Sequence, residues 1–213
     1  QVLDQKVAES RDFWTWRRGR AWPEIRSVGL AHLEARVGPQ DGAWPIGEEL
    51  FPEIIATRHR VGQDQLWVTA TTGLSAQRMA GVEQYLDDPD GAARIELAIA
   101  RRTADQAGAD LLGALARIPF GRCTWLGEGH TIGGAPGSYP AFGPDKAALL
   151  LTATPPAADG WPAPDLRGLS RRGTPVVYLW VLVIDEDTFR LARGRDARAA
   201  LDHLAATGGS WIQ

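Results

Sequence analysis

One unbroken apolar stretch dominates the hydrophobic pattern of the chain. Nine consecutive residues, 176–184, are apolar. A strand with one face in water alternates apolar and polar residues, so this run predicts a strand that is covered on both faces. A membrane-spanning helix needs roughly 20 such residues, so the run is too short to cross a bilayer. Asp185 follows as a candidate N-cap and Gly194 as a stop, which predicts a short helix directly after the strand.

Shorter β-rich runs predict four further strands, at residues 54–60, 66–72, 94–102 and 147–154. The first two are joined by a turn at residues 62–64 and are expected to form a hairpin. In the third, Ile95, Leu97 and Ile99 alternate with charged or small residues. This alternation predicts a strand with one buried face and one exposed face.

Apolar residues at helical spacing predict three longer helices, at residues 23–37, 105–118 and 196–207. Pro119 is expected to end the second helix, because proline lacks the N–H that would continue the hydrogen-bond ladder. The segments between the predicted elements are rich in glycine and proline. We interpret three of them as loops or connectors, at residues 40–47, 127–145 and 155–175.

Composition narrows the classes of protein to which the chain can belong. With 213 residues, 44% of them hydrophobic, it has the length and make-up of a globular protein with one large domain or two small lobes. Its net charge of −3 provides no general attraction to nucleic acid or anionic lipid. We therefore expect neither a nucleic-acid partner nor a membrane partner. The abundance of arginine, alanine and glycine hints at a GC-rich bacterial genome.

The cysteine content bears on the cellular compartment. Cys123 is the single cysteine, so no intrachain disulfide can form, and we expect a cytoplasmic protein in which this side chain is buried. No signal peptide is visible. The chain begins at Gln1 rather than at methionine, so the sequence does not tell whether residues before it were removed.

The first 22 residues are interpreted as an N-terminal Trp/Arg-rich segment, followed by a domain at residues 23–213. Trp14, Trp16, Arg17 and Arg18 interleave aromatic and basic side chains, a composition typical of protein interfaces. They are candidate partner-binding residues. The alternative is that the tryptophans pack the segment onto the domain while the arginines lie over them or in solvent. A nucleic-acid interface needs a wider basic field than this segment offers.

His130 is the leading candidate for a group that takes part in acid–base chemistry. It lies close to Glu128 in a glycine-rich loop, where an imidazole can exchange protons near neutral pH. These two residues are candidates for partner binding or, together with Ser75, for acid–base chemistry, unless His130 only holds the loop backbone. The glycines around them match neither the Walker pattern nor the dinucleotide-binding pattern. Four scattered histidines and one cysteine predict no metal site, and we expect no cofactor.

Three stretches, in this order, resemble the Suppressor of Fused-like domain family. The first, at residues 66–79, reads LWVTATTGLSAQRM and is similar to the family's strand and Thr-x-Gly-Met-Ser-like turn, with Leu74 where the family often has methionine. The second, at residues 126–132, reads LGEGHTI and is similar to its Gly-His-Thr turn. The third, at residues 176–194, is similar to its strand and the following acidic helix start. The resemblance extends over residues 23–194 and leaves the tryptophan-rich start without a counterpart.

The resemblance implies an α/β (α+β) fold in which helices flank a mixed, largely antiparallel sheet. It implies a protein-binding role rather than an enzyme, since animal members bind and restrain a transcription factor. Bacterial members are similar to immunity proteins, so we expect a protein partner, with a toxin encoded nearby as the leading candidate and steric occlusion as the mode of action. Two alternatives stay open: a regulatory scaffold that binds an extended peptide by strand addition, and a hydrolase that uses His130 with Glu128 or Ser75. The oligomeric state is left open.

Overall fold

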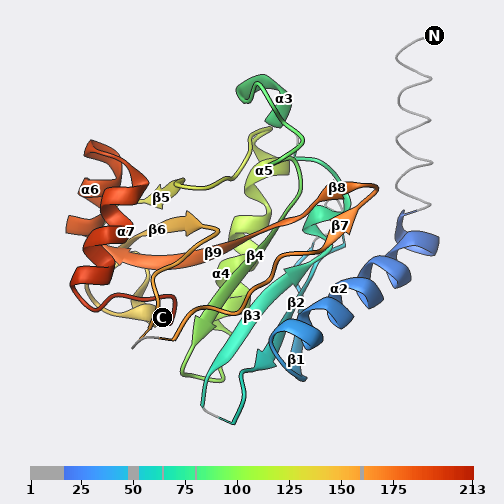
Figure 1. Cartoon of the computed structure of the whole chain (residues 1–213), viewed down its shortest axis with the longest axis horizontal. Coiled ribbons are helices and arrows are strands. Elements are labelled where there is room, and N and C mark those ends of the chain that lie inside the picture. Colours follow the sequence, from blue (N-terminus) through green and yellow to red (C-terminus); the bar gives the residue numbers. More distant parts are fainter. Residues whose placement is uncertain (1–16, 48–52, 64, 80, 159–160) are drawn as a thin grey trace.

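The computed structural model describes residues 17–213, apart from residues 48–52, 64, 80 and 159–160. Its centre is a seven-stranded sheet with the strand order β1-β2-β3-β4-β9-β6-β5 (Figure 1). Neighbouring strands are antiparallel except β4 and β9, which run parallel. From edge to edge the strands are β1 (Gln40–Pro45), β2 (Ile55–Arg60), β3 (Trp67–Thr72), β4 (Ile95–Arg101), β9 (Val177–Asp185), β6 (Lys146–Thr152) and β5 (Thr131–Gly133). A small hairpin precedes β9 and consists of β7 (Ser170–Arg171) and β8 (Thr174–Pro175).

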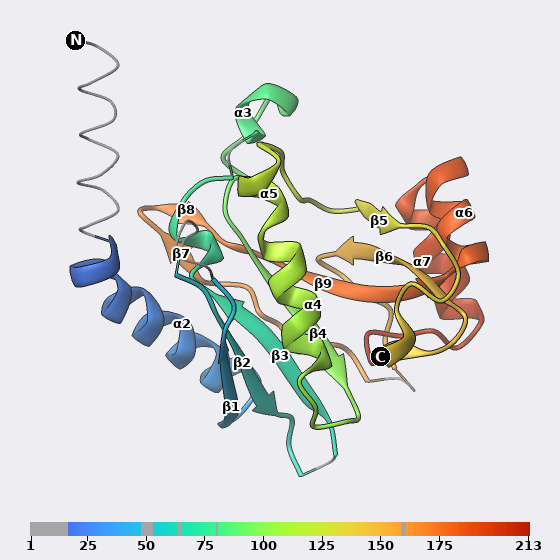
Figure 2. The ribbon, with the colours of Figure 1, turned by 180° about the vertical axis from the view of Figure 1, so that it is seen from behind.

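Helices cover both faces of the sheet (Figures 1 and 2). On one face lie α2 (Trp22–Arg36), preceded by the π-helical turn η1 (Arg17–Ala21), and also α6 (Glu186–Gly194) and α7 (Ala197–Ala206). On the other face lies α4 (Ala107–Ala116), followed by α5 (Ile118–Gly121). Three short elements lie in connections, namely η2 (Leu74–Ala76), α3 (Val82–Tyr85) and η3 (Pro140–Phe142). Among the described helices, none combines the length and the apolar character that spanning a bilayer requires.

Strand β9 contributes to the core on both of its faces. Tyr178 and Trp180 belong to the apolar cluster on the side of α2, α6 and α7, whereas Leu179 and Val181 belong to the cluster on the side of α4. The prediction of a strand covered on both faces is therefore confirmed. The helix predicted after it is also present as α6, where Asp185 Oδ1 accepts a hydrogen bond from the backbone N–H of Thr188 at 2.8 Å. The predicted fold class, a mixed and mostly antiparallel sheet with flanking helices, is confirmed.

Two predictions about strands are corrected by the structure. Residues 40–47, predicted as a loop, contain β1, which pairs with β2 along its whole length. Backbone pairing with β2 outweighs the low strand preference of its glycine and proline. Strand β4, predicted to be half exposed, is buried at all seven positions. The face of β4 that carries Glu96, Ala98 and Ala100 is also buried. The two alanines are small enough to pack there, and Glu96 accepts hydrogen bonds inside the protein.

The structure refines one prediction about a helix end and corrects two others. The helix predicted to stop at Pro119 does end before it, at Ala116 of α4, but a second helix, α5, begins at Ile118 and holds Pro119 in its first turn, where the missing N–H needs no partner. The predicted loop at residues 127–145 contains β5 and η3. Cys123, expected to be buried, is exposed, because it lies at a φ of 48° in the turn that follows α5 rather than in the core.

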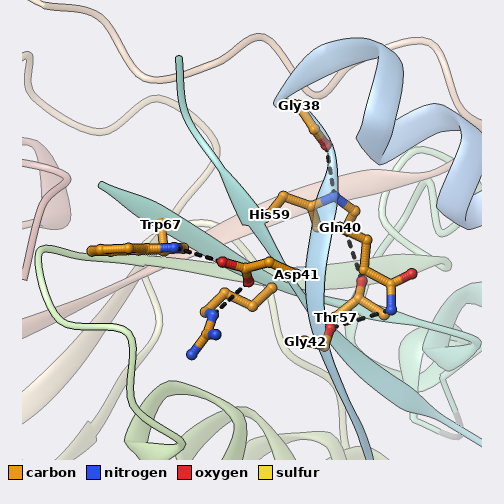
Figure 3. A network of polar contacts seen from close by, with 8 residues as sticks. Gly38, Gln40, Asp41, Gly42, Thr57, His59 and Trp67 are labelled. Atoms are coloured by element: carbon orange, nitrogen blue, oxygen red, sulfur yellow. Dashed lines mark hydrogen bonds and ion pairs between the residues drawn. The ribbon is translucent and has the colours of Figure 1, made fainter. Parts of the chain in front are cut away.

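A buried histidine joins the end of α2 to β2 (Figure 3). His59 is fully buried, its Nδ1 donates to the Gly38 carbonyl oxygen at 3.0 Å, and its Nε2 accepts from the Thr57 hydroxyl at 2.9 Å. A neutral imidazole has one donor and one acceptor nitrogen, so these contacts satisfy the neutral ring. Burial lowers the pKa of His59 below its ordinary value of 6.5, and the hydrogen bond to Gly38 opposes this change.

We expect the free energy of unfolding to fall as the pH is lowered below about 6.5, because the unfolded chain protonates His59 at its ordinary pKa and the folded chain only at lower pH. In that window the unfolded state binds more protons and is stabilised relative to the folded state. Urea unfolding at about pH 7.5 and about pH 5.5 measures the effect. His59→Gln should show a smaller difference between the two pH values, whereas the same difference as in the wild type would contradict this account.

Candidate functional site

The structure separates the two groups of predicted partner-binding residues. Glu128 and His130 lie in the loop before β5, at one edge of the sheet. The turn η1 leads into α2, which lies over the opposite half of the sheet (Figures 1 and 2). The N-terminal candidates Trp14 and Trp16 lie outside the described residues. Arg17 and Arg18 lie in η1. The loop before β5 is therefore a candidate site of its own.

Contacts on both sides fix this loop in place. Glu128 Oε1 accepts from the Thr152 hydroxyl at 2.7 Å, and Oε2 accepts from the backbone N–H of Ala153, which ties the loop to the end of β6. The His130 ring packs edge-on against Trp125, with 4.3 Å between the ring centroids. Burial lowers the pKa of His130, so its imidazole is neutral near neutral pH and offers one donor and one acceptor.

The groups of the hydrolase alternative are not brought together. Ser75 is fully buried, and its hydroxyl donates to Glu96 Oε1 at 2.6 Å. In the part of the chain that the structure describes, no hydrogen bond, ion pair or ring contact joins Ser75, Glu128 and His130 to one another. The described residues also contain no group of three or more His, Cys, Asp or Glu side chains able to hold a metal ion. A nucleophile needs its base within hydrogen-bond reach, and these three side chains do not have that arrangement.

The turn after β3 encloses a buried carboxylate that sequence analysis misses. Glu96 in β4 is fully buried and accepts four hydrogen bonds of 2.6–3.0 Å, from the hydroxyls of Thr71 and Ser75 and from the backbone N–H groups of Gly73 and Ser75. Burial raises the pKa of Glu96, and the hydrogen bonds oppose this rise. Gly73 adopts a φ of 111°, a conformation that favours glycine. The Thr-Thr-Gly-Leu-Ser sequence therefore holds a glutamate rather than presenting a nucleophile.

The outer edge of β5 presents backbone groups that meet no further strand in the described chain. The carbonyl oxygen of His130 and the N–H of Gly134 both bond to the β6 side, as acceptor and donor respectively. Successive residues of a strand turn their N–H and C=O groups to alternate sides, so the groups of Thr131 and Gly133 are directed outward. Unpaired groups of this kind form a template on which a strand from another chain can pair.

The opposite edge strand, β1, has features that disfavour pairing with a strand from another chain. The strand begins with a shift in register that marks a β-bulge. Asp41, at this bulge, accepts from Arg58 Nε at 2.6 Å and from Trp67 Nε1 at 2.8 Å (Figure 3). At the other end of the strand, Pro45 has no N–H to donate. Bulges, charged residues and prolines are features by which natural sheets prevent edge pairing, so β5 is the edge more open to a partner.

A cavity that no sequence pattern predicts lies beside β9. The cavity has a volume of about 730 Å³ and lies between β9 and residues 162–170 of the preceding connection. Tyr178, Trp180, Leu166 and Leu169 contribute to its lining. Its volume is in the range of small-molecule pockets. Neither Glu128 nor His130 lines it, and much of its wall comes from a connection that has no periodic pattern by which the cavity could be predicted.

Residues 53–213 match the family described as Suppressor of fused protein (SUFU). No curated protein sequence matches the chain. The resemblance predicted from the sequence is therefore confirmed over the greater part of the chain.

Three solved structures share the fold. One is described as a suppressor of fused homolog from Neisseria gonorrhoeae FA 1090, with a TM-score of 0.54, 15% identity and coverage of 89% of this chain and 93% of that chain. A chain of the Sufu–Fu complex has a TM-score of 0.59 and 16% identity, with coverage of 88% and 87%. Drosophila Suppressor of Fused has a TM-score of 0.53 and 15% identity, and the match covers 85% of this chain but 47% of that one. At these identities the likeness concerns the fold.

Proposed function

The chain belongs to the suppressor of fused family, and from this premise we propose that it is a protein-binding domain that acts without catalysis. One support is that a chain of similar fold was solved in the Sufu–Fu complex. A second is that the side chains considered for hydrolysis are held apart in the described structure by separate hydrogen-bonding partners. A domain of this kind acts on its partner by occupying a surface.

The partner is proposed to bind at the β5 edge. The observation that carries this proposal is the outward direction of the backbone groups of Thr131 and Gly133, next to Glu128 and His130. In strand addition, backbone hydrogen bonds supply affinity and neighbouring side chains supply specificity. Glu128 orders the loop through β6, so the edge is shaped before the partner arrives, which lowers the entropic cost of binding. The N-terminal tryptophans and arginines stay a predicted second contact.

The biological role we propose is that of an immunity protein. In the cytoplasm of a bacterium, the domain would bind a toxin encoded next to its own gene and block the toxin by steric occlusion. The similar fold of the Neisseria gonorrhoeae protein supports a bacterial setting. A regulatory scaffold that holds an extended peptide without neutralising a toxin is the second candidate, and the open edge of β5 favours it equally.

Co-expression with the polypeptide encoded next to the gene tests this role. We expect one complex in size-exclusion chromatography and restored growth of cells in which that polypeptide is toxic. Growth inhibited by an unrelated toxin should not be restored. A complex that forms without restoring growth would favour the scaffold, and the absence of any complex would contradict the proposed role.

A further inference from the structure

Arg94 is a buried positive charge without a negative partner. It directly precedes β4, is only 7% exposed, and donates through Nη1 to the Ser75 carbonyl oxygen at 2.8 Å. Its Nε is buried without a hydrogen-bond partner. Within the described residues, no carboxylate forms an ion pair with it. A guanidinium cannot lose its proton in a protein, so this charge is retained, and burying it unpaired is costly.

A second arginine whose Nε is buried without a hydrogen-bond partner lies on the hairpin of β7 and β8. Arg171 in β7 is half-buried and donates through Nη2 to the Ile25 carbonyl oxygen of α2 at 2.8 Å, while its Nε is buried without a partner. The hairpin lies beside the start of β4, because β9 follows it directly and the N–H of Val177 donates to the Arg94 carbonyl oxygen at 3.0 Å.

Two other charged groups near Arg94, namely Arg78 and Glu96, already have partners of their own. Burial, followed by the positive charges of Arg172, Arg78 and Arg171, lowers the pKa of Arg94. Arg78 is paired with Glu83 and Asp90. Glu96 also bonds to Ser75, but its carboxylate is fully buried and already accepts four hydrogen bonds. Arg94 and Arg171 therefore keep positive charges with which no carboxylate of the described residues forms an ion pair.

We propose that Arg94 and Arg171 form a binding site for an oxyanion, a carboxylate or a phosphate group. Each guanidinium has five N–H donors, and Arg94 and Arg171 each use one hydrogen bond to the protein. The planar fork of arginine matches the two oxygens of such a group and binds it by charge-assisted hydrogen bonds. The oxyanion comes either from an acidic side chain of a protein or from a free phosphate. The site lies near α2, away from the β5 edge, and does not depend on binding there (Figures 1 and 2).

Isothermal titration with inorganic phosphate at constant ionic strength tests the site. We expect saturable binding with one phosphate per chain, weakened roughly tenfold or more in Arg171→Gln, because the substitution removes a charge-assisted hydrogen bond to the anion. Arg171→Lys keeps the charge and should bind with intermediate affinity. Arg195→Gln removes an exposed arginine after α6 and should bind like the wild type. A parallel titration with an Asp/Glu-rich peptide and its Asn/Gln version decides between the two sources.

Several outcomes would overturn the proposal. One is the absence of saturable binding of both phosphate and the acidic peptide. Another is an Arg171→Gln protein that unfolds at the wild-type temperature and still binds as tightly as the wild type. A third is equal weakening by Arg171→Gln and Arg195→Gln, because that would indicate attraction to the overall charge rather than to this site.

Discussion

Replacing Glu96 with alanine is expected to lower the free energy of unfolding by about 4 kcal/mol or more. The substitution removes the acceptor of four buried hydrogen bonds, and each buried polar group left without a partner costs about 1–3 kcal/mol. Domains of this kind are stable by only about 5–15 kcal/mol, so the variant should unfold at a much lower temperature or fail to fold at all. Thermal unfolding followed by circular dichroism measures the change.

Glu96→Gln is the matched control. Glutamine keeps the side-chain shape and one carbonyl oxygen, so the N–H groups of Gly73 and Ser75 keep their acceptor, and the Thr71 hydroxyl can turn to accept from the amide. We expect a loss of about 1–2 kcal/mol. If the alanine variant were as stable as the wild type, the carboxylate would not hold the turn after β3, and the structural role given to this motif would be wrong.

Proline in place of Thr131 is expected to weaken binding of the partner about tenfold to a hundredfold. It removes an outward-directed N–H of β5 and leaves a carbonyl of the partner strand unpaired, at a cost of about 1–3 kcal/mol. The fold should tolerate the change, because edge strands accept proline where the N–H faces solvent. Isothermal titration with the polypeptide encoded next to the gene measures the affinity.

The other edge of the sheet provides the control for this variant. The N–H of Ile46 donates to the Ile54 carbonyl oxygen, so the alternation of the strand directs the backbone of Ala43 outward on β1. Ala43→Pro therefore makes the same chemical change on the β1 edge and should leave the affinity unchanged. Equal affinities of both variants and the wild type, or equal weakening by both, would exclude β5 as the specific binding edge.

Sequence patterns predicted the centre of the fold because they report local burial. The apolar run of β9 and the N-cap of α6 depend on residues adjacent in the chain, and both were found. Strand β1 was missed because its pairing with β2 is a tertiary interaction that its own glycine and proline do not reveal. Strand β4 was predicted as half exposed because a glutamate usually faces water, whereas Glu96 is buried by hydrogen bonds from residues more than 20 positions away.

The candidate site was predictable only in part, for the same reason. The family resemblance depends on short motifs, and it singled out the loop of Glu128 and His130, which the structure places beside an open edge. That Thr131 and Gly133 direct their backbone outward depends on strand order, which no local pattern encodes. Arg94 likewise lies near the hairpin of Arg171 only because β4 pairs with β9, the strand that follows the hairpin, and this pairing joins segments that are distant in the sequence.

Amide hydrogen exchange, with and without the polypeptide encoded next to the gene, tests the central claim most directly. The account predicts that the amides of Thr131 and Gly133 exchange quickly in the free protein and become protected in the complex, because a partner strand then accepts from them. A complex in which both amides exchange as in the free protein, while protection appears elsewhere on the surface, would contradict it.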